Sequence, residues 1–105
     1  MSISERYRDL TLEVMTFRDS LSQGTEEESK ELRNIKEAAG GLAELQEAVG
    51  EIPRMKLEYQ LTPVLLKAHS RLDRARLILE EQGAEDRAAA VWDLEQKIYR
   101  LLNDL

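Results

Sequence analysis

The sequence has 105 residues, of which 42% are hydrophobic and 34% charged, with five glycines, two prolines and no cysteine. This length suits one domain, here residues 1–105, and the scarcity of helix breakers favours long helices over a turn-rich β fold. The net charge of −6 argues against a dedicated nucleic-acid binder, and the lack of cysteine excludes disulfides and thiolate metal sites and favours a reducing, cytoplasmic location.

The first expected helix covers residues 4–22. Ser2 and Glu5 fit a capping box at its start, and Gly24 is a typical C-terminal stop. The N-terminus has no apolar segment of the signal-peptide kind, and no run in the chain approaches the ~18 apolar residues that a membrane span needs. Apolar residues recur at alternating spacings of four and three, as on one helical face: Ile3, Tyr7, Leu10, Val14, Phe17 and Leu21.

The second expected helix covers residues 26–49. Thr25 and Glu28 fit a capping box at its start. Gly40 and Gly41 lie inside the segment, where two glycines cost roughly 2 kcal/mol relative to alanine. We therefore expect a kink, a break or a close helix crossing at 40–41, and an end to the segment before Pro53.

The third segment is ambiguous at its start. Residues 54–62 alternate as in a strand, but a lone strand has no partner here. Either the third helix starts near Pro53 and bends at Pro63, or Thr62 caps a helix over 63–82 with Pro63 in its first position. We favour the second interpretation, with Gly83 closing the helix.

The last expected helix covers residues 85–104, with Glu85 and Asp86 in its first turn. Short connections between helices of similar length imply antiparallel neighbours. The sequence therefore predicts an all-α fold, an antiparallel bundle of three to four helices. The alternative is a homodimer in which helical hairpins from two chains complete one bundle.

Groups that support catalysis are scarce. His69 is the one histidine, and Leu66 stands where a Glu-x-x-His metal motif would need glutamate. Gly40 and Gly41 lack the Lys-Ser/Thr and the preceding strand of a phosphate-binding loop. We expect no enzyme activity, no catalytic residue, no metal and no cofactor.

Two pairs of apolar residues are candidates for partner binding. Leu12 lies opposite the main apolar face of the first helix, with Met15 beside it. Trp92 and Tyr99 share one edge of the last helix and belong to the residue types favoured at binding hot spots. The partner would be another protein or a second copy of the chain. The alternative is that Leu12 is an ordinary exposed leucine and that the aromatic pair widens the core face.

Residues 54–76 carry six basic and two acidic side chains, a local net charge of +4. Within them, the basic face of Lys67, Arg71 and Arg74 would suit an acidic partner, a phosphate backbone or an anionic lipid. The alternative is a solvated helix face paired with the acidic second helix.

A polar patch of His69, Asp73 and Arg76 lies between the apolar face and a flanking ridge. It suits a pH-sensitive contact or half of an intermolecular metal site. The alternative is a satisfied polar group at a helix interface.

These features rank three functional hypotheses. The leading one is a non-enzymatic protein–protein interaction module, such as an adaptor, co-chaperone, assembly factor or inhibitor, that acts through surplus apolar helix faces. The rival is a nucleic-acid or anionic-surface binder that uses the basic face. The third is a bundle that holds a small ligand between its helices.

Overall fold

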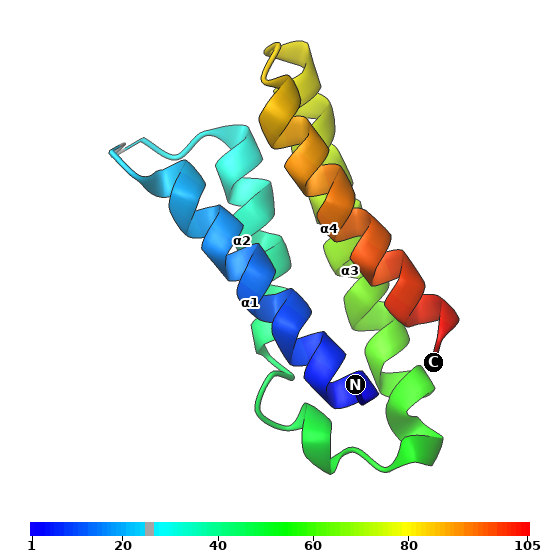
Figure 1. Cartoon of the computed structure of the whole chain (residues 1–105). Coiled ribbons are helices and arrows are strands. Elements are labelled where there is room, and N and C mark those ends of the chain that lie inside the picture. Colours follow the sequence, from blue (N-terminus) through cyan, green and yellow to red (C-terminus); the bar gives the residue numbers. More distant parts are fainter. Residues whose placement is uncertain (25–26) are drawn as a thin grey trace.

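The computed structural model describes residues 1–24 and 27–105, which form four α-helices, one short 3₁₀ turn and no strand. Successive helices run in opposite directions, so both termini lie at the same end of the molecule (Figure 1). The predicted antiparallel bundle is confirmed. In chain order the elements are α1 (Ile3–Ser22), α2 (Lys30–Ala43), η1 (Val49–Glu51), α3 (Arg54–Glu81) and α4 (Glu85–Asn103).

Hydrogen-bonding side chains begin the first two helices. The Ser2 hydroxyl accepts a hydrogen bond from the Glu5 amide at 3.2 Å, as predicted, and Gly24 follows α1 with a φ of 73°. The Ser29 hydroxyl caps α2 by accepting from the Leu32 amide at 3.2 Å. The capping box predicted at Thr25 lies outside the described residues.

The second helix is shorter than the predicted 26–49. It passes through Gly40 and Gly41 and ends at Ala43. A Cβ at either glycine would meet nothing within 4 Å, so there is no close helix crossing at this point. A side chain of α1 holds the loop after α2 in place: Arg8 donates hydrogen bonds to the carbonyls of Gln46 (3.0 Å) and Glu47 (3.2 Å). These carbonyls therefore find partners without a helix, and α2 ends early.

The third helix starts at Arg54 and continues through Pro63, so the favoured prediction of a helix capped by Thr62 is wrong. Pro63 has no N–H to offer the carbonyl one turn earlier, a defect that costs roughly 3 kcal/mol in a helix interior. Tyr59 is the residue whose carbonyl Pro63 leaves without a helical partner, and both residues are exposed. Leu61 is fully buried, and a buried leucine contributes about 2 kcal/mol. The core contacts of the first turns therefore offset most of the cost of proline.

A Schellman motif ends α3 at Gly83, where the sequence predicted the helix to stop. Gly83 has a φ of 75°, its amide donates to the Glu80 carbonyl at 3.0 Å, and the Ala84 amide donates to the Leu79 carbonyl at 2.9 Å. The chain then enters α4 at Glu85. This tight connection makes α3 and α4 a hairpin.

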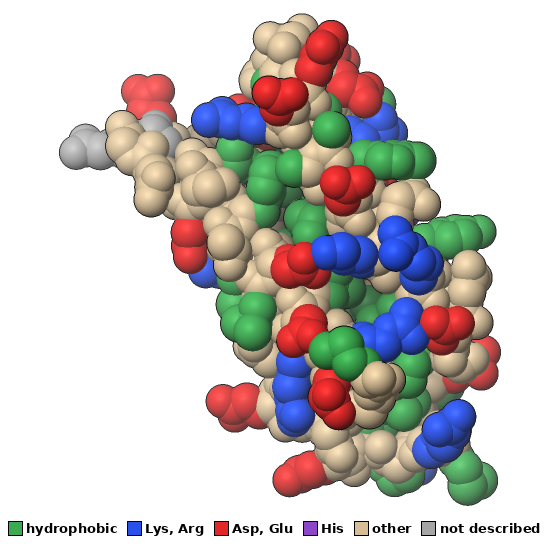
Figure 2. All heavy atoms as spheres, in the orientation of Figure 1, with side chains coloured by type: hydrophobic (Ala, Val, Ile, Leu, Met, Phe, Trp, Pro, Cys, Tyr) green, Lys and Arg blue, Asp and Glu red, His purple; other side chains and the backbone are tan. Residues whose placement is uncertain are grey.

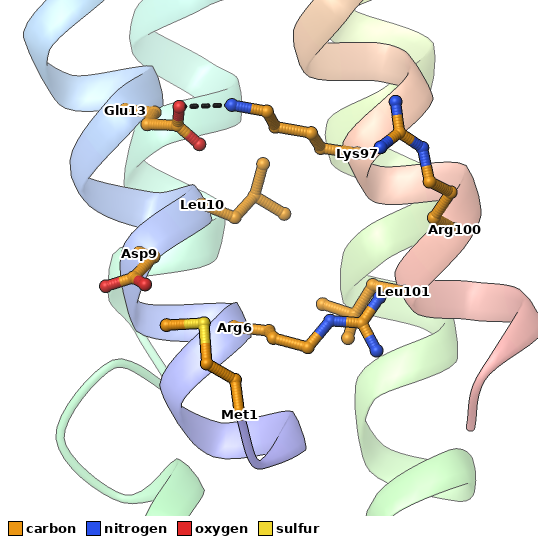
Figure 3. Close-up of a pocket in the computed structure, with 8 residues that line it drawn as sticks. All are labelled: Met1, Arg6, Asp9, Leu10, Glu13, Lys97, Arg100 and Leu101. Atoms are coloured by element: carbon orange, nitrogen blue, oxygen red, sulfur yellow. Dashed lines mark hydrogen bonds and ion pairs between the residues drawn. The ribbon is translucent and has the colours of Figure 1, made fainter.

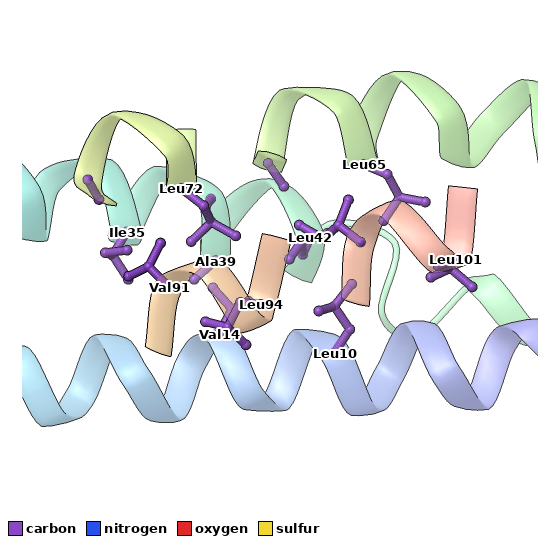
Figure 4. Packing of buried hydrophobic residues seen from close by; sticks show 14 of the residues in the cluster. Leu10, Val14, Ile35, Ala39, Leu42, Leu65, Leu72, Val91, Leu94 and Leu101 are labelled. Atoms are coloured by element: carbon purple, nitrogen blue, oxygen red, sulfur yellow. The ribbon is translucent and has the colours of Figure 1, made fainter. Parts of the chain in front are cut away.

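The hydrophobic core draws on all four α-helices (Figure 4). Tyr7 is fully buried in it, and its hydroxyl donates a hydrogen bond to the Leu42 carbonyl at 2.6 Å near the end of α2. Burial and the nearby Glu44 raise the pKa of Tyr7, so the hydroxyl keeps its proton. The largest apolar side chains without exposed surface include Ile35, Leu42, Leu61, Leu65, Leu72 and Ile98.

Candidate functional site

The junction between α3 and α4 brings two of the predicted sets of residues together. The Arg76 guanidinium lies 5.3 Å from the centroid of the Trp92 ring, in a cation–π contact. His69 Nε2 lies 3.6 Å from Glu95 Oε1, two turns further along the hairpin. These contacts fix the register of the two antiparallel helices. They place the predicted polar patch beside Trp92 of the predicted aromatic pair.

A buried glutamate completes the polar patch. Glu95 has no exposed surface, and its Oε2 lies 3.2 Å from Arg76 Nε. Arg76 is also bound to Asp73 Oδ1 through Nη2 (2.7 Å) and Nε (3.1 Å), and to Glu80 through Nη1 (2.7 Å). One guanidinium therefore faces three carboxyl groups, with His69 on the other side of Glu95.

The pKa values of the two acidic groups nearest Arg76, Glu95 and Asp73, are shifted in opposite directions. Burial raises the pKa of Glu95 to about 8, the nearby Asp73 carboxylate raises it as well, and Arg76 opposes both effects. Burial alone would raise the pKa of Asp73, but hydrogen bonds from Arg76 outweigh it and hold that pKa below the usual value. At neutral pH, Arg76 is thus neutralised by Asp73 and Glu80, while Glu95 keeps its proton.

Sequence reasoning missed Glu95, although the sequence contained a signal. Ala88 and Val91 precede Glu95 by seven and four residues, and Leu102 follows it by seven, so all lie on one stripe of the helix. These three residues are at least half-buried. A carboxyl group inside an apolar stripe indicates a buried acid that needs a partner on the neighbouring helix.

Exposed apolar side chains lie along the same hairpin, beginning beside the Arg76–Asp73 ion pair. Tyr59, Leu66, Trp92 and Tyr99 are 83%, 54%, 48% and 57% exposed. Thr62 and His69 on α3, and Gln96 on α4, continue the same rows. Neighbouring members of each row are three or four residues apart, so each row follows one helical stripe. We call this surface the outer α3–α4 face, and define it as Tyr59, Thr62, Leu66, His69, Trp92, Gln96 and Tyr99.

The opposite side of the hairpin looks different. On the α1 and α4 surface turned toward the viewer in Figure 2, acidic and basic side chains alternate, with hydrophobic side chains between them. Ion pairs join the two helices there, between Glu13 and Lys97 and between Arg6 and Asp104 (2.7 Å). The scarcity of charge is therefore a property of the outer α3–α4 face and not of the whole molecule.

The structure separates the two residues predicted as a contact face on α1. Leu12 is 52% exposed, whereas Met15 is partly buried and packs against the core. Leu12 thus stands without Met15 on the outward side of its helix. Neither residue lies on the α3–α4 hairpin that carries Trp92 and Tyr99.

The basic face is partly neutralised by α2. Arg71 Nε lies 2.9 Å from Glu37 Oε2, which is the pairing expected of a solvated helix face. Lys67 and Arg74 flank this ion pair and are exposed. Arg71 and Glu37 also separate two surface grooves between α2 and α3, of about 430 and 450 Å³. Gly40 and Gly41 line the first of these grooves.

A smaller hollow lies between α1 and α4, lined by Leu10 and Leu101 and crossed by the Glu13–Lys97 ion pair (Figure 3). Its volume is about 190 Å³, below the roughly 300–1,000 Å³ of typical small-molecule sites. A hollow of about 390 Å³ lies beside Trp92 at one end of the outer α3–α4 face.

Residues 1–24 and 27–105 show neither a membrane-spanning helix nor a group of metal ligands. No helix in this part of the chain is long and apolar enough to cross a membrane. In the same part, the histidine, aspartate and glutamate side chains form no group of three placed to hold a metal ion. The outer α3–α4 face, with the Glu95 cluster beneath it, is therefore the candidate site. Comparison with protein-family models, curated proteins and solved structures found no match for this chain.

Proposed function

We propose that the chain is a non-enzymatic protein–protein interaction module that acts through the outer α3–α4 face. The observation that carries the proposal is the exposure of four large apolar side chains, Tyr59, Leu66, Trp92 and Tyr99, on a surface whose adjoining charges, Arg76 and Asp73, are paired with each other. The centres of protein interfaces are depleted in charged residues and enriched in tyrosine and tryptophan. Roles such as adaptor, co-chaperone, assembly factor or inhibitor all use a surface of this kind.

The other two hypotheses receive less support. A nucleic-acid binder needs several free cations to replace counterions, whereas Arg71 of the basic face is held by Glu37 and the whole chain carries a net charge of −6. A small-ligand site needs a concave, mostly enclosed cavity. The larger hollows described above are surface grooves between helices.

The test is a comparison of three tagged forms of the protein in its source cell: the wild type, Leu66→Lys and Leu12→Lys. Both leucines are about half exposed, so both substitutions place the same charge in water without touching the core. We expect the wild type and Leu12→Lys to retain the same stoichiometric protein partner, and Leu66→Lys to lose it. Identical partners for all three forms would contradict the proposal.

A further inference from the structure

We propose that the outer α3–α4 face binds a second copy of this chain, in an antiparallel arrangement with two-fold symmetry. The inference rests on the proposed function, because it names the partner of that same face. A two-fold interface is self-complementary, so a surface patch must fit itself after rotation by half a turn. Charge, shape and area each support this arrangement.

The charges at the two ends of the face are opposite. Residues 80–87, at the connection between α3 and α4, carry four acidic and one basic side chain, a net charge of −3. Residues 54–60, at the start of α3, carry two basic and one acidic side chain, a net charge of +1. An antiparallel pairing places the acidic end of each copy over the basic end of the other. Between these ends the face brings no like charges together, which matters for two chains that each carry −6.

The shape of the face is also complementary to itself. Met55 and Tyr59 are 96% and 83% exposed near one end, and the hollow of about 390 Å³ lies near the other. An axis through the middle of the face, near Leu66 and Tyr99, brings Tyr59 of one copy over Trp92 of the other. The protruding side chains of each copy would then fill the partner's hollow, which is lined by Arg76, Glu80, Glu85, Ala88, Ala89 and Trp92.

The side of the molecule that carries this face is large enough for a stable dimer. The molecule measures 42 × 24 × 21 Å, so one lengthwise face covers about 900 Å². Specific protein–protein interfaces bury about 800 Å² on each partner. The outer α3–α4 face lies within a side of this size, and its four exposed apolar side chains are spread along it.

The first experiment measures the molar mass in solution. At about 100 µM, a hundredfold above a dissociation constant of 1 µM, we expect the wild type and Leu12→Lys to have twice the monomer mass. Leu66→Lys should raise the dissociation constant about 30-fold or more, as at an interface hot spot. The variant is therefore compared with the wild type after dilution to about 10 µM, where the wild type should stay mostly dimeric and Leu66→Lys should be mostly monomeric. Circular dichroism checks that each variant keeps its helices. A monomeric wild type, or a dimer that Leu66→Lys leaves intact, would overturn the proposal.

The second experiment tests the antiparallel arrangement and uses the absence of cysteine from the chain. In the double variant Met55→Cys/Ala89→Cys, the two thiols of one chain lie more than ~30 Å apart along the hairpin, at 1.5 Å per residue. In the proposed dimer, the thiol at position 55 of one chain lies next to the thiol at position 89 of the other chain. Oxidation should therefore give covalent dimers of the double variant and none of Met55→Cys alone, whereas a parallel pairing would cross-link the single variant.

The two proposals fail in different ways. A monomeric chain whose Leu66→Lys variant still loses a different protein partner would refute self-association and leave the proposed function standing. A dimer through this face that has no further partner would support the inference and narrow the function to self-assembly. A monomer whose captured proteins do not depend on Leu66 would refute both proposals.

Discussion

Replacing Glu95 by glutamine should make the protein more stable at high pH. The pKa of Glu95 is raised from 4.5 to about 8 in the folded chain, chiefly by burial. Between these values the folded state holds a proton that the unfolded state has lost, so the free energy of unfolding falls as pH rises. The slope is about 1.4 kcal/mol per pH unit, or roughly 3–4 kcal/mol between pH 5 and pH 8. Glutamine has the same shape and does not titrate, so it removes this loss.

The assay is urea denaturation of the wild type and Glu95→Gln at several values in that pH range. We expect the two free energies of unfolding to be close at the acidic end and to diverge in favour of the variant as pH rises. Asp73 has a lowered pKa and so affects stability below its ordinary value of 3.8, outside this window. Because His69 also faces the carboxyl group, the pair is measured again in a His69→Gln background. A variant that is less stable throughout would show that Glu95 is ionised and paired with Arg76, which would refute the reasoning.

Three further predictions concern the fold. Tyr7→Phe leaves the buried Leu42 carbonyl without its hydrogen bond and should lower the free energy of unfolding by about 1–2 kcal/mol in urea denaturation; an unchanged value would show that the bond contributes nothing net. Gly40→Ala should raise stability by about 0.5–1 kcal/mol, since open space surrounds its Cβ position, whereas Gly83→Ala should lower it by about 1 kcal/mol because of its positive φ. Thermal melting separates the two, and shifts in the same direction would contradict this account. Pro63→Ala should stabilise α3 by about 1–3 kcal/mol by restoring a helical hydrogen bond, and a lower denaturation midpoint would disprove this.

Local signals in the sequence were enough for most helix boundaries. The periodic apolar positions and the residues Ser2, Gly24 and Gly83 act within one or two turns of where they stand. The early end of α2 is different, because it depends on Arg8, which lies 38 residues before the carbonyl of Gln46 that it binds. A contact of this range leaves no periodic trace in the sequence.

The same distinction explains the outcome at Pro63 and at the candidate site. Proline marks a helix boundary by its local chemistry, but the burial of Leu61 in the core decides that α3 continues. The positions of Trp92 and Tyr99 on one helix edge could be predicted from their spacing of seven residues. The placement of Trp92 beside the polar patch could not, because it depends on the register between α3 and α4.

The proximity of the two termini has a consequence for how the chain can be built. Arg6 and Asp104 are joined by an ion pair of 2.7 Å, and α4 contacts α1, although less extensively than α2 does. The four helices thus form a closed ring whose order around the bundle does not depend on where the chain starts. A circular permutant that links the present ends and opens at the exposed Pro53, between η1 and α3, would translate the α3–α4 hairpin first, with the same core and the same outer face.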